Sequence, residues 1–148
     1  MRTELWKLAL VIIALACAQS RDPGDEPASS MTAELVGPRW RLVELEGQPS
    51  IAGGGAREPH LIFSQSDSVD RVGGATGCNI MGGTYETDGA RIRFSQLFST
   101  KMACVEEDRM RQETRFLRAL ESADRYAISG DTLTLSAGNA VVARFVRS

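Results

Sequence analysis

Short segments of alternating apolar and polar residues, separated by turn-forming pairs, constrain the fold of this chain more than any other feature of its sequence. Two such pairs stand between alternating segments, Asp88-Gly89 and Gly130-Asp131. Asp-Gly is a strong hairpin signal because both residues accept positive φ angles. The expected strands cover residues 39–45, 60–64, 68–74, 83–87, 90–95, 125–129, 132–136 and 140–146. Successive short strands joined by tight turns predict an antiparallel sheet.

One longer segment, residues 105–123, interrupts the strands and has the periodicity of an amphipathic helix. Its apolar residues Met110, Phe116, Leu117 and Leu120 are expected on one broad face. The acidic first turn suits the positive end of the helix dipole. Strands on both sides of a single helix predict a mainly β, α+β fold, with the sheet curled around or packed on that helix.

The first residues are typical of an export signal. Arg2 and Lys7 precede nine apolar residues at 8–16, which as a helix would span only about 14 Å, well short of a bilayer core. The segment therefore resembles the apolar region of a secretory signal and not a membrane-spanning helix. Residues 14–17, "ALAC", resemble a lipobox, in which Cys17 becomes the lipidated N-terminus. The alternative is ordinary signal cleavage near Ala16 or Ala18.

These observations predict three parts: a lipoprotein signal peptide at 1–16, a flexible tether at 17–32 and a folded domain at 33–148. The tether is rich in Pro, Ser, Asp and Gly and has no apolar periodicity. Acyl chains on Cys17 would make the membrane a partner. Ala18 lacks the acidic character that retains lipoproteins in the inner membrane, so in a Gram-negative host the expected location is the periplasmic face of the outer membrane.

The segment 73–83, "GGATGCNIMGG", has no phosphate-binding pattern. It contains no lysine, which a P-loop requires, and its glycine spacing is not that of a dinucleotide-binding turn. Its glycines instead suit bulges, positive φ or close backbone approach. Asn79 suits a left-handed conformation or hydrogen bonds to nearby backbone.

Cys78 and Cys104 are the two cysteines that remain if Cys17 carries lipid. In an exported protein the expected pairing is a disulfide between them. Two buried free thiols are the alternative. A zinc site made of both cysteines and His60 would lack a clear fourth ligand and any C-x-x-C spacing, so no metal or cofactor is expected.

Several motifs together resemble the META domain, or HslJ-like, family of bacterial envelope proteins. They are W-R-L at Trp40, G-x-x-G-C-N-x-x-x-G-x-Y at 74–85, T-K-M-A-C at 100–104, M-x-x-E-x-x-F-L-x-A-L at 110–120, and the L-x-L at 133–135. The resemblance runs from about residue 36 to the C-terminus. It implies a small antiparallel, β-barrel-like fold with one helix, often placed behind a lipobox.

The family is linked to heat-shock induction and to novobiocin resistance, and the resemblance implies neither an enzymatic activity nor an agreed active site. The motif residues are therefore expected to be structural. They are Gly74, Gly77, Cys78, Asn79, Gly83, Tyr85, Thr100, Cys104 and Glu113.

Three functional classes remain. The leading hypothesis is a non-catalytic, lipid-anchored envelope protein with a role in stress tolerance or novobiocin resistance, whose expected partners are the membrane and another envelope protein. The second is a module that binds a small apolar ligand or a peptide at the barrel mouth, with the loops at 51–59 and 95–103 as rims. Phe98 and Met102 are its candidate contacts, although we expect both to fill the core. A net charge of −2 excludes an electrostatic nucleic-acid binder.

The third class is a hydrolase. Ser64, Ser66 and Ser68 lie near His60 and Asp67 in the sequence, but no serine stands in a G-x-S-x-G elbow. We therefore expect no catalytic residues. His60 begins an apolar strand and is interpreted as a strand-edge residue.

Glu113 is the polar residue for which we most expect a structural role within the fold. It lies between Met110 and Leu117, towards the apolar face of the expected helix. If buried, its carboxylate must accept hydrogen bonds. The expected donors are backbone amides of the glycine-rich segment or the hydroxyl of Thr100.

Overall fold

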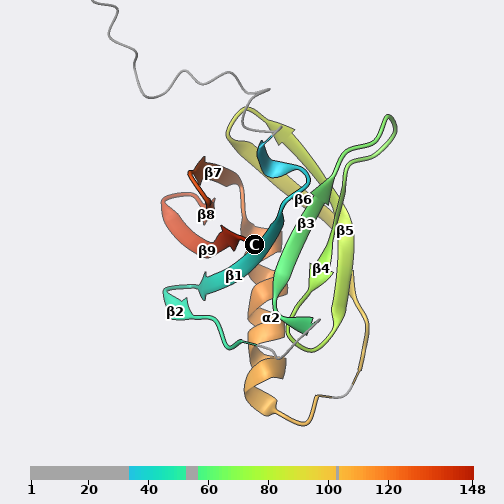
Figure 1. The fold of residues 1–148 in the computed structure, drawn as a ribbon, viewed down its shortest axis with the longest axis vertical. Coiled ribbons are helices and arrows are strands. Elements are labelled where there is room, and N and C mark those ends of the chain that lie inside the picture. Colours follow the sequence, from blue (N-terminus) through green and yellow to red (C-terminus); the bar gives the residue numbers. More distant parts are fainter. Residues whose placement is uncertain (1–33, 53–56, 103) are drawn as a thin grey trace, which may run out of the picture.

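The computed structural model describes residues 34–52, 57–102 and 104–148. Its elements are β1 (Arg39–Leu45), β2 (Gln48–Pro49), β3 (His60–Ser64), β4 (Arg71–Ala75), β5 (Ile80–Asp88), β6 (Arg91–Ser99), α2 (Glu107–Ser122), β7 (Arg125–Ser129), β8 (Thr132–Ala137) and β9 (Ala140–Arg147). Figure 1 shows the helix packed against the strands, with its upper part behind β1. The expected mainly β fold with one packed helix is confirmed.

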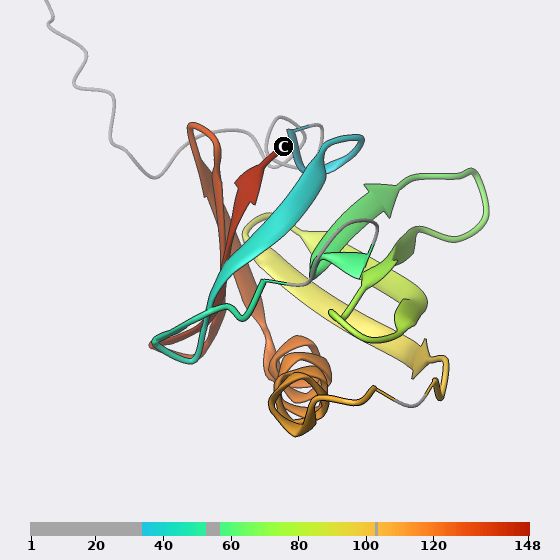
Figure 2. The same ribbon diagram turned by 60° about the horizontal axis from the view of Figure 1, so that its bottom comes forward.

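The strands form one antiparallel, barrel-like sheet. They follow the order β2-β1-β3-β4-β5-β6-β7-β8-β9, and a further pairing of β1 with β9 closes the ring. The pairing between β6 and β7 is much thinner than the others, with the single register pair Arg91↔Arg125 in the described part of the chain. Two halves therefore result, one of β3 to β6 and one of β7 to β9 with β1 (Figure 2).

Beyond the short pairing of β6 with β7, the two halves of the sheet separate, and helix α2 lies across the gap between them (Figure 2). It packs on β6 from one half and on β1, β8 and β9 from the other. Phe116 and Leu120 are fully buried, and the Phe116 ring lies 5.9 Å from that of Phe145 on β9. Burial of such side chains contributes about 1.5–3 kcal/mol each, so the helix completes the core that the open seam would otherwise expose.

The helix buries Phe116 and Leu120 as its apolar pattern predicts, and Leu117 packs against the core, but Met110 does not. Its buried residues are Gln112, Phe116, Ala119 and Leu120. Met110, expected on the buried face, is 49% exposed. The expectation for Met110 was wrong because the buried stripe follows i, i+4, i+7 and i+8 from Gln112, a polar residue that hydropathy alone places outside.

Two further side chains expected in the core are also outside it. Phe98 is 62% exposed and Met102 is 46% exposed. Phe98 lies near the end of β6, opposite Gly82 on β5, and Met102 follows the strand in the connection to α2. Both therefore remain available for contact with another molecule.

The expected strand positions agree closely with the structure, and β1, β3 and β7 have the expected bounds. Strand β5 begins three residues earlier than expected, at Ile80 inside the glycine-rich segment. The loop after β1 contains the two-residue strand β2, which was not expected. The expected signal peptide, the tether and Cys17 lie outside the described residues. Within the described part, no helix has the length and apolar character needed to cross a bilayer.

His60 at the start of β3 is only 7% exposed. Its Nδ1 lies 2.7 Å from the carbonyl oxygen of Glu58 and donates to it, because a carbonyl can only accept. Burial lowers the pKa of His60 below 6.5; the nearby charge of Arg39 lowers it further, while the Glu58 contact partly opposes the shift. The folded protein therefore binds a proton at His60 less readily than the unfolded chain does.

This shift predicts a loss of stability on acidification. The unfolded histidine binds its proton first, so the free energy of unfolding should fall as pH drops from about 7.5 to about 5.5. Because His60 is the only histidine in the chain, His60→Gln should remove most of that slope. Urea denaturation of both proteins across this range measures it; equal slopes would contradict the assignment to His60.

Candidate functional site

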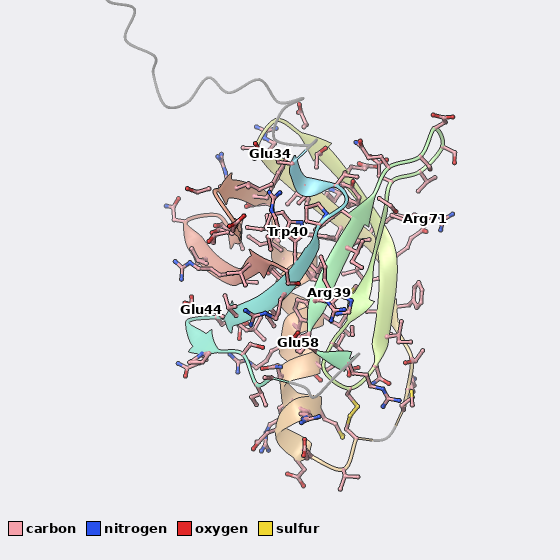
Figure 3. All side chains as sticks on the ribbon, in the orientation of Figure 1. Glu34, Arg39, Trp40, Glu44, Glu58 and Arg71 are labelled. Atoms are coloured by element: carbon pink, nitrogen blue, oxygen red, sulfur yellow. A yellow bond between two sulfur atoms is a disulfide. The ribbon has the colours of Figure 1, made fainter. Side chains whose placement is uncertain are left out.

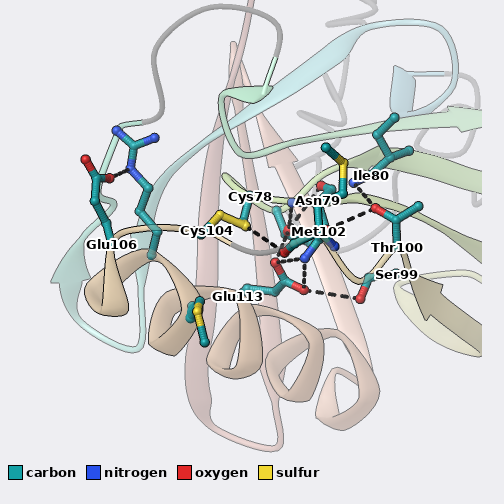
Figure 4. Close-up of a disulfide and its surroundings, with 12 residues drawn as sticks. Cys78, Asn79, Ile80, Ser99, Thr100, Met102, Cys104, Glu106 and Glu113 are labelled. Carbon is teal, nitrogen blue, oxygen red and sulfur yellow. Dashed lines mark hydrogen bonds and ion pairs between the residues drawn. A yellow bond between two sulfur atoms is a disulfide. The ribbon is translucent and has the colours of Figure 1, made fainter.

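The glycine-rich segment and the start of the helix meet at one end of the sheet, where the disulfide lies. Cys78 and Cys104 are bonded, with Cα atoms 5.9 Å apart, as expected. Cys78 follows the end of β4, and Cys104 precedes α2 in the connection from β6 (Figure 4). The bond therefore ties the β4–β5 loop to the entry of the helix. It occupies both sulfur atoms, which leaves no thiolate for the zinc site considered above.

At two positions of this segment, the backbone geometry explains why the residue is glycine. A Cβ at Gly74 would lie 1.9 Å from the carbonyl oxygen of His60 on the neighbouring strand, a distance that no side chain allows. Gly77 has a φ of +103°, and a Cβ there would also press on Pro59 at 3.2 Å. Close backbone approach therefore requires glycine at position 74, and the positive φ favours it at position 77.

Glu113 reaches from the helix into this loop and holds three polar side chains. Its Oε2 accepts a hydrogen bond from Thr76 Oγ1 at 2.9 Å, and its Oε1 accepts one from Ser99 Oγ at 3.2 Å. Asn79 Nδ2 lies 2.9 Å from both carboxylate oxygens. Hydrogen bonds to a charged acceptor are stronger than those between neutral groups. The donors are thus side chains, and the expectation of backbone amides or Thr100 was wrong.

Asn79 connects Glu113 of the helix to the segment that follows β6. It is only 6% exposed, and its Oδ1 accepts hydrogen bonds from Met102 N at 2.7 Å and from Thr100 Oγ1 at 3.1 Å. Its backbone N–H donates to Thr76 Oγ1 at 3.1 Å. One amide side chain therefore joins the helix carboxylate to the β4–β5 loop and to the connection that leads to Cys104.

A cleft of about 420 Å³ opens beside this network. The network contributes Asn79, Ser99, Thr100 and Glu113 to its wall, and the other lining residues are Lys101, Met102, Met110 and Thr114. Both methionines are about half exposed, at 46% and 49%. Thioethers are adaptable contact groups. Because the carboxylate of Glu113 is already occupied by donors from the protein, the cleft is better suited to binding than to acid–base chemistry.

Sequence reasoning missed three residues that build this end of the molecule: Thr76, Ser99 and Gln112. The side chain of Gln112 is 5% exposed. Its Oε1 accepts from Ile51 N at 2.6 Å and its Nε2 donates to Ile51 O at 3.0 Å. The glutamine thus fixes one end of the loop after β2. Its spacing of four residues from Phe116 was the available signal, but its polarity concealed it.

The remaining candidate residues have structural positions. Tyr85 is 2% exposed, and its ring packs edge-on against Phe63 at 5.0 Å. Burial raises the pKa of Tyr85 to about 12, and Asp70 and Tyr126 add to the shift. At Gly83, a Cβ would lie 2.7 Å from Leu97 Cδ2, where the β5–β6 register shifts.

The serines considered for hydrolysis lie on the β3–β4 hairpin. Ser64 Oγ donates to the carbonyl of Arg71, and Ser66 Oγ donates to that of Val69 at 2.6 Å. The Nδ1 of His60 also faces a carbonyl. These contacts are those of a structural hairpin, with backbone oxygens as partners, and not those of a serine activated by a base.

The network predicts that Glu113→Ala lowers the free energy of unfolding by about 1–3 kcal/mol, because Asn79, Thr76 and Ser99 lose their shared acceptor. Thermal or urea denaturation measures the loss. Glu107→Ala is the matched control, since Glu107 is on the same helix with a side chain 84% exposed. Equal stability of the two variants would show that the network contributes nothing.

The disulfide predicts a second effect. The two cysteines are 26 residues apart, and closing a loop of this length stabilises the native state by about 3–4 kcal/mol in the chain-entropy model. The double variant Cys78→Ala/Cys104→Ala should lose a comparable amount in urea denaturation. Reduced wild-type protein should behave like the variant. A wild-type protein whose stability is insensitive to reductant would contradict the role assigned to the bond.

Comparisons with known proteins agree with this architecture. The chain is similar to an NMR structure of a protein from Burkholderia xenovorans, with 24% identity and a TM-score of 0.61, covering 93% of this chain and 99% of the other. A second NMR structure has 17% identity and a TM-score of 0.60, covering 77% and 92%. A crystal structure of a DUF4847 family protein from Bacteroides vulgatus has 16% identity and a TM-score of 0.50, covering 76% and 93%. At these identities the likeness concerns the fold alone.

No curated protein matches the chain significantly. The model of the META domain family, however, matches residues 33–148. This range contains every described element and all of the motif residues that meet around the disulfide. The chain therefore belongs to the META domain family.

Proposed function

We propose that the protein is a non-catalytic, lipid-anchored module of the cell envelope that supports tolerance of stress such as heat or novobiocin. The observation that carries the proposal is the bond between Cys78 and Cys104. Disulfides persist outside the cytoplasm and are rare inside it. Together with the lipobox-like residues 14–17, the bond supports an exported protein attached through Cys17. The role in stress rests on the family resemblance.

The absence of catalysis in this proposal is supported by the way the polar groups are used. Glu113 has donors on both carboxylate oxygens, and Ser64 and Ser66 of the β3–β4 hairpin donate to backbone carbonyls. A general base needs a free acceptor within reach of the proton that it removes. These groups instead stabilise loops.

The first described residue lies far from the disulfide and its cleft. Figure 3 shows Glu34 at the end of the molecule opposite the disulfide. A flexible tether that continues from this end to a lipid on Cys17 would leave the cleft free to meet partners in the envelope.

A second candidate function is binding of a small ligand or a peptide at this cleft. The observation that favours it is the exposure of Met102 and Met110, two large apolar side chains beside a cleft of about 420 Å³. Exposed apolar groups around a concave surface are typical of binding sites. Lys101 would add an attraction for an acidic group on the ligand.

Native mass spectrometry of the protein extracted from its own membranes tests both candidates. Wild-type protein should carry a lipid-sized mass increase and should fractionate with membranes. Cys17→Ala should carry no lipid and appear in the soluble envelope fraction, whereas the tether control Ser20→Ala should remain anchored. A strain whose only copy of this protein is the Cys17→Ala variant should lose tolerance of heat or novobiocin.

The other outcomes separate the hypotheses. Wild-type protein without lipid, found in the soluble fraction, would overturn the anchor. A further adduct that leaves on gentle activation, and that Met102→Ala abolishes, would favour the binding function. An anchored protein whose loss leaves stress tolerance unchanged would overturn the role in stress and retain the anchor.

A further inference from the structure

The outer surface of strands β3 to β6 carries a groove that neither function above uses. The strand registers align four residues across it: Ile62 pairs with Gly73, Gly73 with Gly82, and Gly82 with Phe98. Their neighbours Phe63, Val72 and Met81 are buried, so this row faces outwards, because side chains alternate between the two faces of a sheet. We name this row, with two glycines between Ile62 and Phe98, the glycine groove.

Phe98 forms one wall of the glycine groove, and its ring lies against the surface of the sheet. Its ring reaches over Gly82, where an added Cβ would lie 2.6 Å from Cζ and 2.9 Å from Cε1. The missing side chain therefore lets the ring approach the sheet. Even so, Phe98 remains 62% exposed, which leaves much of the ring accessible to a ligand.

Gly73 provides the floor, and the structure gives no packing reason for a glycine there. A Cβ at this position would have Met81 O as its nearest neighbour, at 4.0 Å, and Gly73 is not among the residues with positive φ. This differs from Gly74, Gly82 and Gly83, where a Cβ would collide. Glycine inside a strand weakens it and often marks the close approach of a ligand. The glycine at 73 keeps the groove open at a cost to the strand.

The groove has a volume of about 430 Å³ and one charged side chain in its lining, Arg71 on β4. Figure 3 shows Arg71 pointing outwards from this side of the sheet. Within the described residues, the Arg71 guanidinium and the Gln96 side-chain amide make no hydrogen bond or ion pair with another side chain. Thr84, whose hydroxyl donates to Ser95 O, retains a free acceptor position. An anionic group at Arg71 would gain the strong bidentate pairing that guanidinium offers.

We propose that the glycine groove binds a sugar residue that carries a carboxylate, as part of an acidic polysaccharide. The C–H face of the sugar ring lies on Phe98, whose aromatic face is electron-rich. The glycine floor allows the ring to approach the backbone closely. The carboxylate pairs with Arg71, and the hydroxyl groups bond to Gln96 and Thr84.

Two features favour an acidic sugar over an apolar ligand. An apolar molecule would cover Arg71 and Gln96 without giving either group a partner, which costs free energy. A neutral sugar would leave only the guanidinium unpaired. A ligand with one apolar face, several hydroxyls and one negative charge satisfies all parts of the groove. The proposal does not depend on lipidation of Cys17 or on the disulfide cleft.

The test uses the full chain in detergent and two matched probes, the methyl glycosides of glucuronic acid and of glucose, which differ by the carboxylate. Titration is followed by NMR chemical-shift changes. Glucuronoside should shift the amides of Ile62, Gly73, Gly82 and Phe98. It should bind at least about tenfold more tightly than the glucoside, as expected for a charge-assisted hydrogen bond.

Three variants assign the contacts. Gly73→Val should fill the floor and reduce glucuronoside binding at least about tenfold, while the melting temperature stays equal or rises, because valine favours strands. Phe98→Ala should weaken both probes. Arg71→Gln should remove the preference for the acidic probe. Ser129→Val is the control, since Ser129 is an exposed strand residue on β7 in the other half of the sheet.

Several results would overturn the proposal. They include wild-type binding that Gly73→Val leaves unchanged, shifts confined to the cleft around Met102, and the absence of any shift. Should Gly73→Val fail to fold, unchanged binding by folded Phe98→Ala and Arg71→Gln would overturn it equally. Octanoate that binds as tightly as glucuronoside and loses binding in the same variants would replace the acidic sugar with an apolar acid.

Discussion

The contact between the Glu113 carboxylate and the Asn79 amide holds the disulfide end of this molecule together. Asn79 donates to the helix through Nδ2 and accepts from the connection before the helix through Oδ1. A single buried side chain thus fixes three segments that are distant in the sequence. Because these polar groups are largely withdrawn from water, each must keep its partner, and loss of one leaves the others unsatisfied. The disulfide acts on the same segments but through the unfolded chain, whose freedom it reduces.

The short pairing between β6 and β7 explains why the helix is needed to close the core. A ring of strands without free edges would have its backbone hydrogen bonds satisfied, yet β6 and β7 share only one register pair in the described part. The helix covers the remaining gap with Phe116 and Leu120. Its start must then reach the β4–β5 loop, which brings Glu113 to Asn79. The packing of the helix and the polar network are therefore parts of one arrangement.

Two surfaces result, and they differ in character. The cleft at the disulfide combines methionines with a polar network, and the glycine groove on the outer sheet combines an aromatic ring with one unpaired arginine. The exposure of Phe98 in the glycine groove could not be predicted from its position in the chain. A hydrophobic residue in a strand packs inwards unless the register turns it out, and here a shift between Gly82 and Thr84 precedes the outward pairing with Phe98.

The sequence by itself determined the longer strands, the hairpin turns, the helix and the pairing of Cys78 with Cys104. Alternation and turn-forming pairs depend on local backbone preferences, which act over a few residues. Only the tertiary structure decided which polar donors meet Glu113, why Gln112 is buried, and that Phe98, Met102 and Met110 are exposed. These outcomes depend on strand register and on the angle at which the helix crosses the sheet. Such quantities arise from contacts between residues far apart in the chain, where hydropathy at a single position carries no information.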